Sequence, residues 1–172
     1  VNMQDETVWL NAEQMAKRYG QTYNPFARPY STKENPFNDS NGVKVTWTTV
    51  ANATGYRVYR STLSNGKWSN WKNMGTAKST KSSWTDKSVV SGVTYRYTVR
   101  TVSGKALSSY TASASLKYLS VPQLSKAFKT ADGVVISYQQ VVGADGYRIY
   151  RKTADTDWEY LGTVGKKYSA YK

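Results

Sequence analysis

The stretch Gly55-Tyr56-Arg57-Val58-Tyr59-Arg60 decides the fold, because it returns at residues 146–151 as Gly-Tyr-Arg-Ile-Tyr-Arg. An internal repeat of this kind predicts tandem copies of one supersecondary unit. We therefore expect an N-terminal segment at 1–35, a first module at 36–119 and a second module at 121–172. The match extends upstream in the same register, where Val43, Val45, Trp47 and Val50 correspond to Val134, Ile136, Tyr138 and Val141.

Each copy of the repeat alternates apolar and polar residues, a pattern typical of a half-buried strand. Tyr56 and Val58 are expected to face inward, which leaves Arg57 and Tyr59 outward. Asn65-Gly66 is a strong turn signal. Short strands separated by turns at this spacing predict an all-β sandwich. The expected strands cover 43–47, 55–60, 68–74, 82–86, 95–100 and 108–118, then 124–128, 134–138 and 146–151.

A set of spaced motifs then points to a family. They are Val45-x-Trp47, Ala53-x-Gly55-Tyr56-x-Val58-Tyr59-Arg60-Ser61, Trp84-Thr85-Asp86 and Gly92-x-x-Tyr95-x-Tyr97-x-Val99. Together they resemble the fibronectin type III module in its bacterial form. The resemblance implies immunoglobulin-like antiparallel β-sandwich modules in tandem, with Tyr95 as a tyrosine corner whose hydroxyl ties a crossover loop to the backbone. Residues 36–42 are short and polar where the family has its first strand, so the N-terminal arm could take that place.

The second module repeats only part of the first. Trp158, Leu161 and Tyr171 match Trp71, Met74 and Trp84, and the sequence given stops before the counterparts of residues 95–118. Three explanations stay open: the protein continues, a neighbouring chain supplies the strands by β-augmentation, or the half module is a terminal cap. Without the counterparts of residues 95–118, the second module is expected to have an open core and an unpaired sheet edge.

The N-terminal segment is expected to hold a short helix at 11–19 and an extended Pro- and Asn-rich arm. Asn11 is a suitable N-cap, with Gln14 as its capping-box partner. Residues 8–16 resemble the opening helix of some bacterial and phage helix-turn-helix proteins. No recognition helix can follow, because Pro25 and Pro29 disfavour one. Specific DNA binding is therefore not expected, and the segment is predicted to dock on neighbouring proteins or on copies of the chain.

Composition limits the chemistry. The 172 residues include no Cys and no His, which removes disulfides, thiolate metal sites and the commonest general base. No apolar run is long enough to span a membrane. We find no catalytic constellation and expect neither a cofactor nor a metal. The net charge of +13 favours an anionic polymer as a partner; a solvated basic surface is the alternative.

Two sets of side chains are candidate binding sites. The outward residues of neighbouring strands form a basic and aromatic surface, where an anion would relieve the repulsion between opposed arginines; ordinary outward polar residues are the alternative. Exposed tryptophans near a hairpin are candidates for stacking on sugars, or caps of the core. The basic set is Arg57, Tyr59, Arg96, Arg100, Arg148 and Tyr150, and the second set is Trp68, Trp71 and Trp158.

The loop residues Asp155, Asp157 and Glu159 lack the glycine-containing pattern of a calcium loop and are expected to be solvated. The sequence therefore predicts a non-enzymatic structural or adhesive component. It would be a stalk or assembly element of a bacterial surface protein or phage virion, located outside the cell, on the bacterial surface or in the virion. The alternative is a carbohydrate- or polyanion-binding module attached to a secreted protein.

Overall fold

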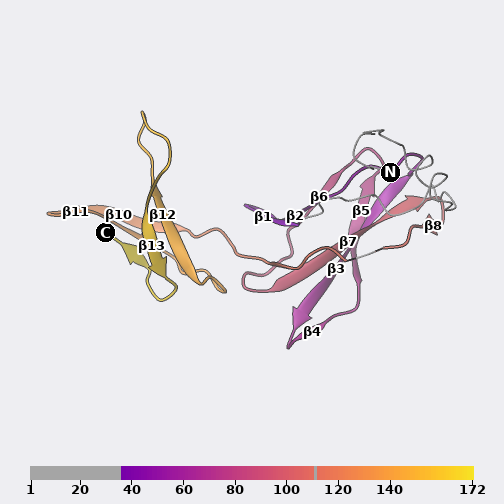
Figure 1. The fold of residues 1–172 in the computed structure, drawn as a ribbon, viewed down its shortest axis with the longest axis horizontal. Helices are drawn as coiled ribbons and strands as arrows, with labels where there is room; N and C mark the ends of the chain where they lie inside the picture. Colours follow the sequence, from indigo (N-terminus) through magenta and orange to yellow (C-terminus); the bar gives the residue numbers. More distant parts are fainter. Residues whose placement is uncertain (1–35, 111) are drawn as a thin grey trace, which may run out of the picture.

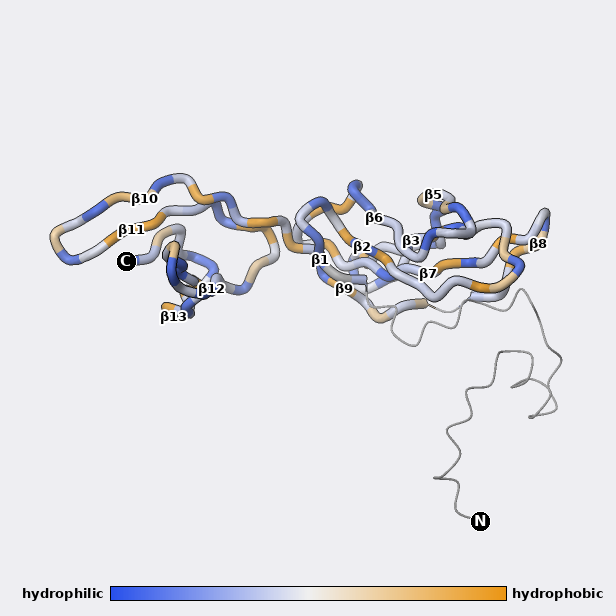
Figure 2. The backbone as a smooth tube through the Cα atoms, turned by 90° about the horizontal axis from the view of Figure 1, so that it is seen from above, coloured by the Kyte–Doolittle hydropathy of each residue, from blue (hydrophilic) through white to orange (hydrophobic). Residues whose placement is uncertain are grey.

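The computed structural model describes residues 36–110 and 112–172. The predicted helix at 11–19 and the arm lie outside these residues. The described chain is built of antiparallel strands, in two groups that lie end to end (Figures 1 and 2). Within the described ranges no helix is long and apolar enough to cross a bilayer.

Two sheets form the first module. One sheet has the order β1-β2-β6, made of Phe37–Asp39, Gly42–Thr46 and Ser83–Asp86. The other has the order β4-β3-β7-β8, made of Lys67–Trp68, Gly55–Ser64, Thr94–Ser103 and Ala106–Leu107. β5 (Lys72–Lys78) also pairs with β3, and β9 (Leu116–Lys117) with β7. Polar as residues 36–42 are, β1 does occupy the place of a first strand, pairing with β2 through three residues.

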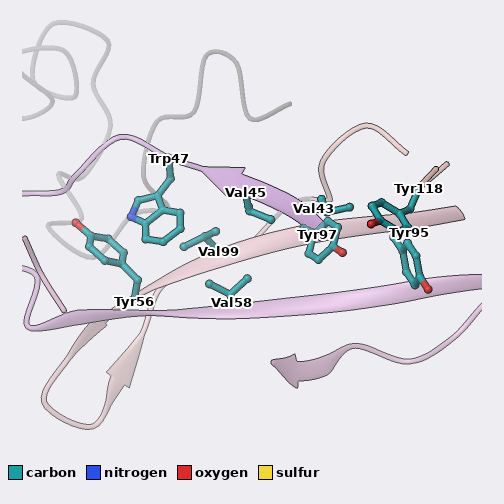
Figure 3. Packing of buried hydrophobic residues seen from close by; sticks show 9 residues of the cluster. All are labelled: Val43, Val45, Trp47, Tyr56, Val58, Tyr95, Tyr97, Val99 and Tyr118. Carbon is teal, nitrogen blue, oxygen red and sulfur yellow. The ribbon is translucent and has the colours of Figure 1, made fainter. Parts of the chain in front are cut away.

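The core lies between these sheets, as the alternation predicts. Val43 and Val45 of β2 face Val58 of β3 and Val99 of β7, and all four are at most 1% exposed (Figure 3). Trp47 and Tyr56 close one end of the core, with ring centroids 5.3 Å apart. The inward sets of both sheets are therefore those that a period of two selects.

The Tyr56 hydroxyl has a second task that alternation does not reveal. It accepts a hydrogen bond of 2.7 Å from the backbone N–H of Val50, in the loop after β2. The second copy of the repeat makes the same bond, from Val141 to the Tyr147 hydroxyl at 2.7 Å. The tyrosine thus fixes the loop that leads into its own strand, which explains why both copies carry Tyr rather than another apolar residue.

Tyr95 forms the predicted tyrosine corner. Its hydroxyl accepts the Val90 N–H at 2.9 Å, which anchors the crossover from β6 to β7. The ring is 3% exposed. The crossover is therefore held by this buried side chain together with backbone hydrogen bonds of Gly92 and Val93 to Tyr118.

We predict that Tyr95→Phe lowers the free energy of unfolding by about 1.5 kcal/mol, because the Val90 amide loses its partner while the ring stays packed. Urea unfolding of the full chain measures this loss. Tyr110→Phe, in a ring that is 46% exposed, is the control and should change little. Equal stability of the two variants would contradict the role of the corner.

A buried charge links the two sheets of the first module. Asp86 of β6 is 1% exposed and accepts hydrogen bonds from Arg60 of β3 at 2.8 Å and from the Tyr97 hydroxyl of β7 at 3.0 Å. Burial alone would raise the pKa of Asp86, but the bonds from the Ser88 hydroxyl and amide and the Arg60 guanidinium outweigh it and lower the pKa. Burial, followed by the Asp86 charge, raises the pKa of Tyr97.

Because the folded pKa of Asp86 is lowered, its ionised form stabilises the fold above the unfolded pKa. We therefore expect that stabilisation to be lost below about pH 5, as the pH falls through the folded value. Asp86→Asn should cost about 3 kcal/mol at pH 7, since it leaves the half-buried Arg60 without its charge partner, and should flatten the acid limb of stability. Chemical unfolding between pH 3 and 7 tests this. Asp132→Asn, at an exposed pair with Lys172, is the control.

Two predicted strands are wrong in extent. Among the described residues of 108–118, only the two-residue β9 is a strand, with β8 before it, and 68–74 divides between β4 and β5. Serine hydroxyls interrupt the ladders. Ser108 accepts the Thr101 N–H through its side chain at 3.0 Å and donates its own N–H to Thr101 at 3.0 Å. Ser113 does the same at Tyr97, and Ser69 at Thr62.

The second module contains two smaller sheets. One has the order β10-β11-β14, made of Leu124–Thr130, Gly133–Tyr138 and Ala170–Tyr171. The other pairs β12 (Gly146–Arg151) with β13 (Glu159–Gly165). These strands repeat β1, β2, β6, β3 and β5 in their pairing. Within the described residues β12 has no partner on the edge that β7 occupies beside β3.

The exposed fractions of the inward side chains show how much of the second core lies uncovered beside this edge. Tyr138, Tyr147 and Ile149 are still buried, and the first two rings lie 4.6 Å apart. Val134, however, is 57% exposed, whereas its counterpart Val43 is 0% exposed. The half of the core that β7 covers in the first module is thus open in the second.

Candidate functional site

The outer face of β3 and β7 carries the predicted basic surface of the first module. The register sets Arg57 directly opposite Arg100 and Tyr59 opposite Thr98, so the expected like-charge neighbours do meet. None of the four predicted side chains on this face is fully exposed. Two of the arginines, Arg96 and Arg100, contact neighbouring aromatic rings.

Arg96 lies between two of the predicted sugar-stacking tryptophans. Its guanidinium carbon is 4.4 Å from the centroid of a Trp68 ring and 5.1 Å from that of Trp71. Its Nε is buried and has no hydrogen-bond partner within the described residues. Aromatic faces attract a guanidinium through their quadrupole, so the two rings stabilise this cation on the sheet.

Arg100 is held in a similar way. Its Nε donates to the Ser108 carbonyl at 2.7 Å, and its guanidinium carbon is 5.5 Å from the Tyr110 ring centroid. Tyr110 in turn packs edge-on against Trp71, with centroids 5.8 Å apart. The rings and cations therefore form a ladder in the order Trp68, Arg96, Trp71, Tyr110 and Arg100. The sequence predicted four of these residues as candidates but not Tyr110, and it did not predict the stacking, because the rings lie outside β3 and β7, the two strands of the basic surface.

We expect the Arg96–Trp71 contact to contribute about 0.5–1 kcal/mol to folding, the usual value for a partly exposed cation–π pair. A double-mutant cycle with Arg96→Met and Trp71→Leu, followed by urea unfolding, isolates this coupling. The matched cycle with Arg57→Met and Trp71→Leu should show none. Coupling of the same size in both cycles would mean that the ladder is not a specific interaction.

The second module presents a different outer face. Arg148 and Thr163 are opposed in the β12–β13 register, as are Tyr150 and Tyr160. These four side chains line an open hollow. The two tyrosine rings are 47% and 55% exposed, with centroids 5.5 Å apart. Trp158, just before β13, is 69% exposed. Of the nine predicted site residues, those of the second module are thus the most open.

The acidic residues of the same hairpin are solvated, as predicted. Asp155, Asp157 and Glu159 are all exposed, and Glu159 pairs with Arg151 at 2.6 Å. Among the residues that the structure describes, no three His, Cys, Asp or Glu side chains gather as a metal site requires. The prediction that the anionic partner binds the first-module face stays a prediction.

No family model matches the chain, and no curated protein matches it. Among solved structures, it is similar to a Fn3-like protein from Clostridium thermocellum, at 31% identity and a TM-score of 0.40, covering 47% of this chain and 82% of that one. It is also similar to the twitchin kinase region from C. elegans, at 15% identity and a TM-score of 0.41, covering 55% of this chain and 16% of that one. A third similar structure is that of the chicken CNTN1 FN1-FN3 domains, at 14% identity and a TM-score of 0.37, covering 84% of this chain and 54% of that one.

Two sheets of three and six strands, joined by a tyrosine corner, define the first module as an immunoglobulin-like β-sandwich. The Fn3-like protein is 31% identical to this chain over 82% of its own length. The chain belongs to the fibronectin type III-like modules. Such a module is a structural or binding unit. The chain spans only 16% and 54% of the second and third proteins, so nothing of their activities transfers.

Proposed function

We propose that this chain is a stalk or assembly element of a bacterial surface protein or phage virion, in which the modules form a semi-rigid row. The observation that supports the proposal is the joint between them. Ser91, in the crossover before β7, donates from its hydroxyl to the Val142 carbonyl of the second module at 2.8 Å. The same hydroxyl accepts the N–H of Ser120 in the linker at 3.0 Å. One side chain thus bonds the first module, the linker and the second module together.

Two glycines allow the modules to approach at this joint. Gly143 has φ of +85°, and a Cβ added there would overlap the Cα of Gly92. Residue 52 is the counterpart of 143 in the first copy and has φ of +62°, but it is Asn. The left-handed backbone therefore does not itself demand glycine, since Asn tolerates it. The demand at 143 comes from the neighbouring module.

A joint of this kind suits a spacer. The linker between the modules is short, so it limits their relative motion, and the contacts at Ser91 and Gly143 restrict it further. The net charge of +13 would favour an anionic surface such as a cell wall polymer or an acidic protein neighbour. The predicted N-terminal helix and arm would supply the docking segment.

We expect Gly143→Ala to loosen the row without unfolding either module. Small-angle scattering should show a wider spread of interdomain distances, and protease should cut the 119–123 linker several-fold faster. Gly66→Ala is the matched control, because Gly66 has a similar φ of +74° with no atom within 4 Å of an added Cβ. It carries the same backbone strain without the contact.

A broad distribution of module orientations in the unsubstituted chain would contradict the proposal of a semi-rigid stalk. So would equal loosening by Gly143→Ala and Gly66→Ala, which would assign the effect to backbone strain alone.

A further inference from the structure

On the outer face of β12 and β13, Arg148 and Tyr150 are exposed, whereas their counterparts Arg57 and Tyr59 in the first module are half-buried. One substitution also changes the chemistry of this face. The bulge between Ile149 and Tyr150 repeats that between Val58 and Tyr59, so Tyr160 takes the place of Asn73. The hollow therefore has two rings where the first module has one. Both rings are about half exposed.

The polar groups of the hollow are arranged around these rings. The Tyr160 hydroxyl lies 2.7 Å from the Thr163 hydroxyl, within a hydrogen bond. Arg148 is exposed and forms no ion pair with any described residue. Its counterpart in the first module, Arg57, is half-buried and lies opposite a second arginine, Arg100. The cation of this hollow is thus available to an external anion.

We propose that the hollow lined by Arg148, Tyr150, Tyr160 and Thr163 binds an acidic oligosaccharide built of uronic acid units. The apolar face of a pyranose ring fits an aromatic side chain, which is amphipathic and rigid. The guanidinium fork matches the two oxygens of a carboxylate. The hydroxyls of Tyr160 and Thr163 can exchange hydrogen bonds with sugar hydroxyls.

The charge pattern favours this ligand over single-stranded nucleic acid. A nucleic-acid strand needs a groove of cations that follows its phosphates, along with rings for its bases. Here the nearest cation along β12 is Arg151, which is already paired with Glu159 at 2.6 Å. The hollow thus offers one unpaired cation beside two rings, which suits one carboxylate on one sugar ring.

Calorimetric titration of the full chain with a tetramer of galacturonic acid tests the proposal. We expect saturable binding that weakens at least about tenfold in Arg148→Gln, because a charge-assisted hydrogen bond is lost. Tyr160→Asn should weaken it similarly, and it installs the residue that the first module already carries at this position. Arg57→Gln, at the equivalent position of the first module, is the control and should bind as the unsubstituted chain does.

Three outcomes would overturn the proposal. The first is the absence of saturable binding. The second is equal affinity for the methyl-esterified tetramer, which keeps the rings but lacks the charge. The third is tighter binding of oligothymidylate with the same dependence on Arg148 and Tyr160. Circular dichroism of each variant confirms that the fold is retained, and the joint between the modules plays no part in the readout.

Discussion

The pairing of β3 with β7 is the constraint on which the first module depends. It runs from Gly55 opposite Val102 to Leu63 opposite Thr94 without a shift in register. On the inner face this pairing brings Tyr56 and Val58 beside β7, and so closes the core over β2. On the outer face it brings the arginines of the two strands together. A slip of one residue would exchange these faces, so core and surface are fixed by the same bonds.

In the second module, β12 has no strand in the place of β7 among the residues that the structure describes. Its inward residues still bury themselves, because Tyr138, Tyr147 and Ile149 cluster between the two sheets. The rest of the inner surface stays open, as the exposure of Val134 shows. Side-chain alternation is therefore enough to start a sandwich core, but completing one requires strands on both sides of β12.

Positions that depend on the polarity of a single residue, or on one local motif, were predicted correctly from the sequence. The period of two identified Val43, Val45, Tyr56 and Val58 as core, and the motif around Tyr95 identified the corner. Sequence-based prediction failed where side chains compete with the backbone. Ser108 and Ser113 satisfy amides of β7 with hydroxyls, so the ladder stops although the residues around them favour strands. It also missed the partners of Arg96, because contact between a strand and a distant loop leaves no periodic signal.

The glycine at residue 143 has a consequence for how such a chain can change. Residues 52 and 143 have related backbone conformations in two copies of one unit, yet only the latter abuts another module. Duplicated units are therefore not interchangeable along the row: a copy moved to a new place must alter its contact positions before it can sit tightly. Under the proposed stalk function, a single side-chain carbon at that position would turn a fixed joint into a hinge, so mechanical stiffness could evolve independently of the fold.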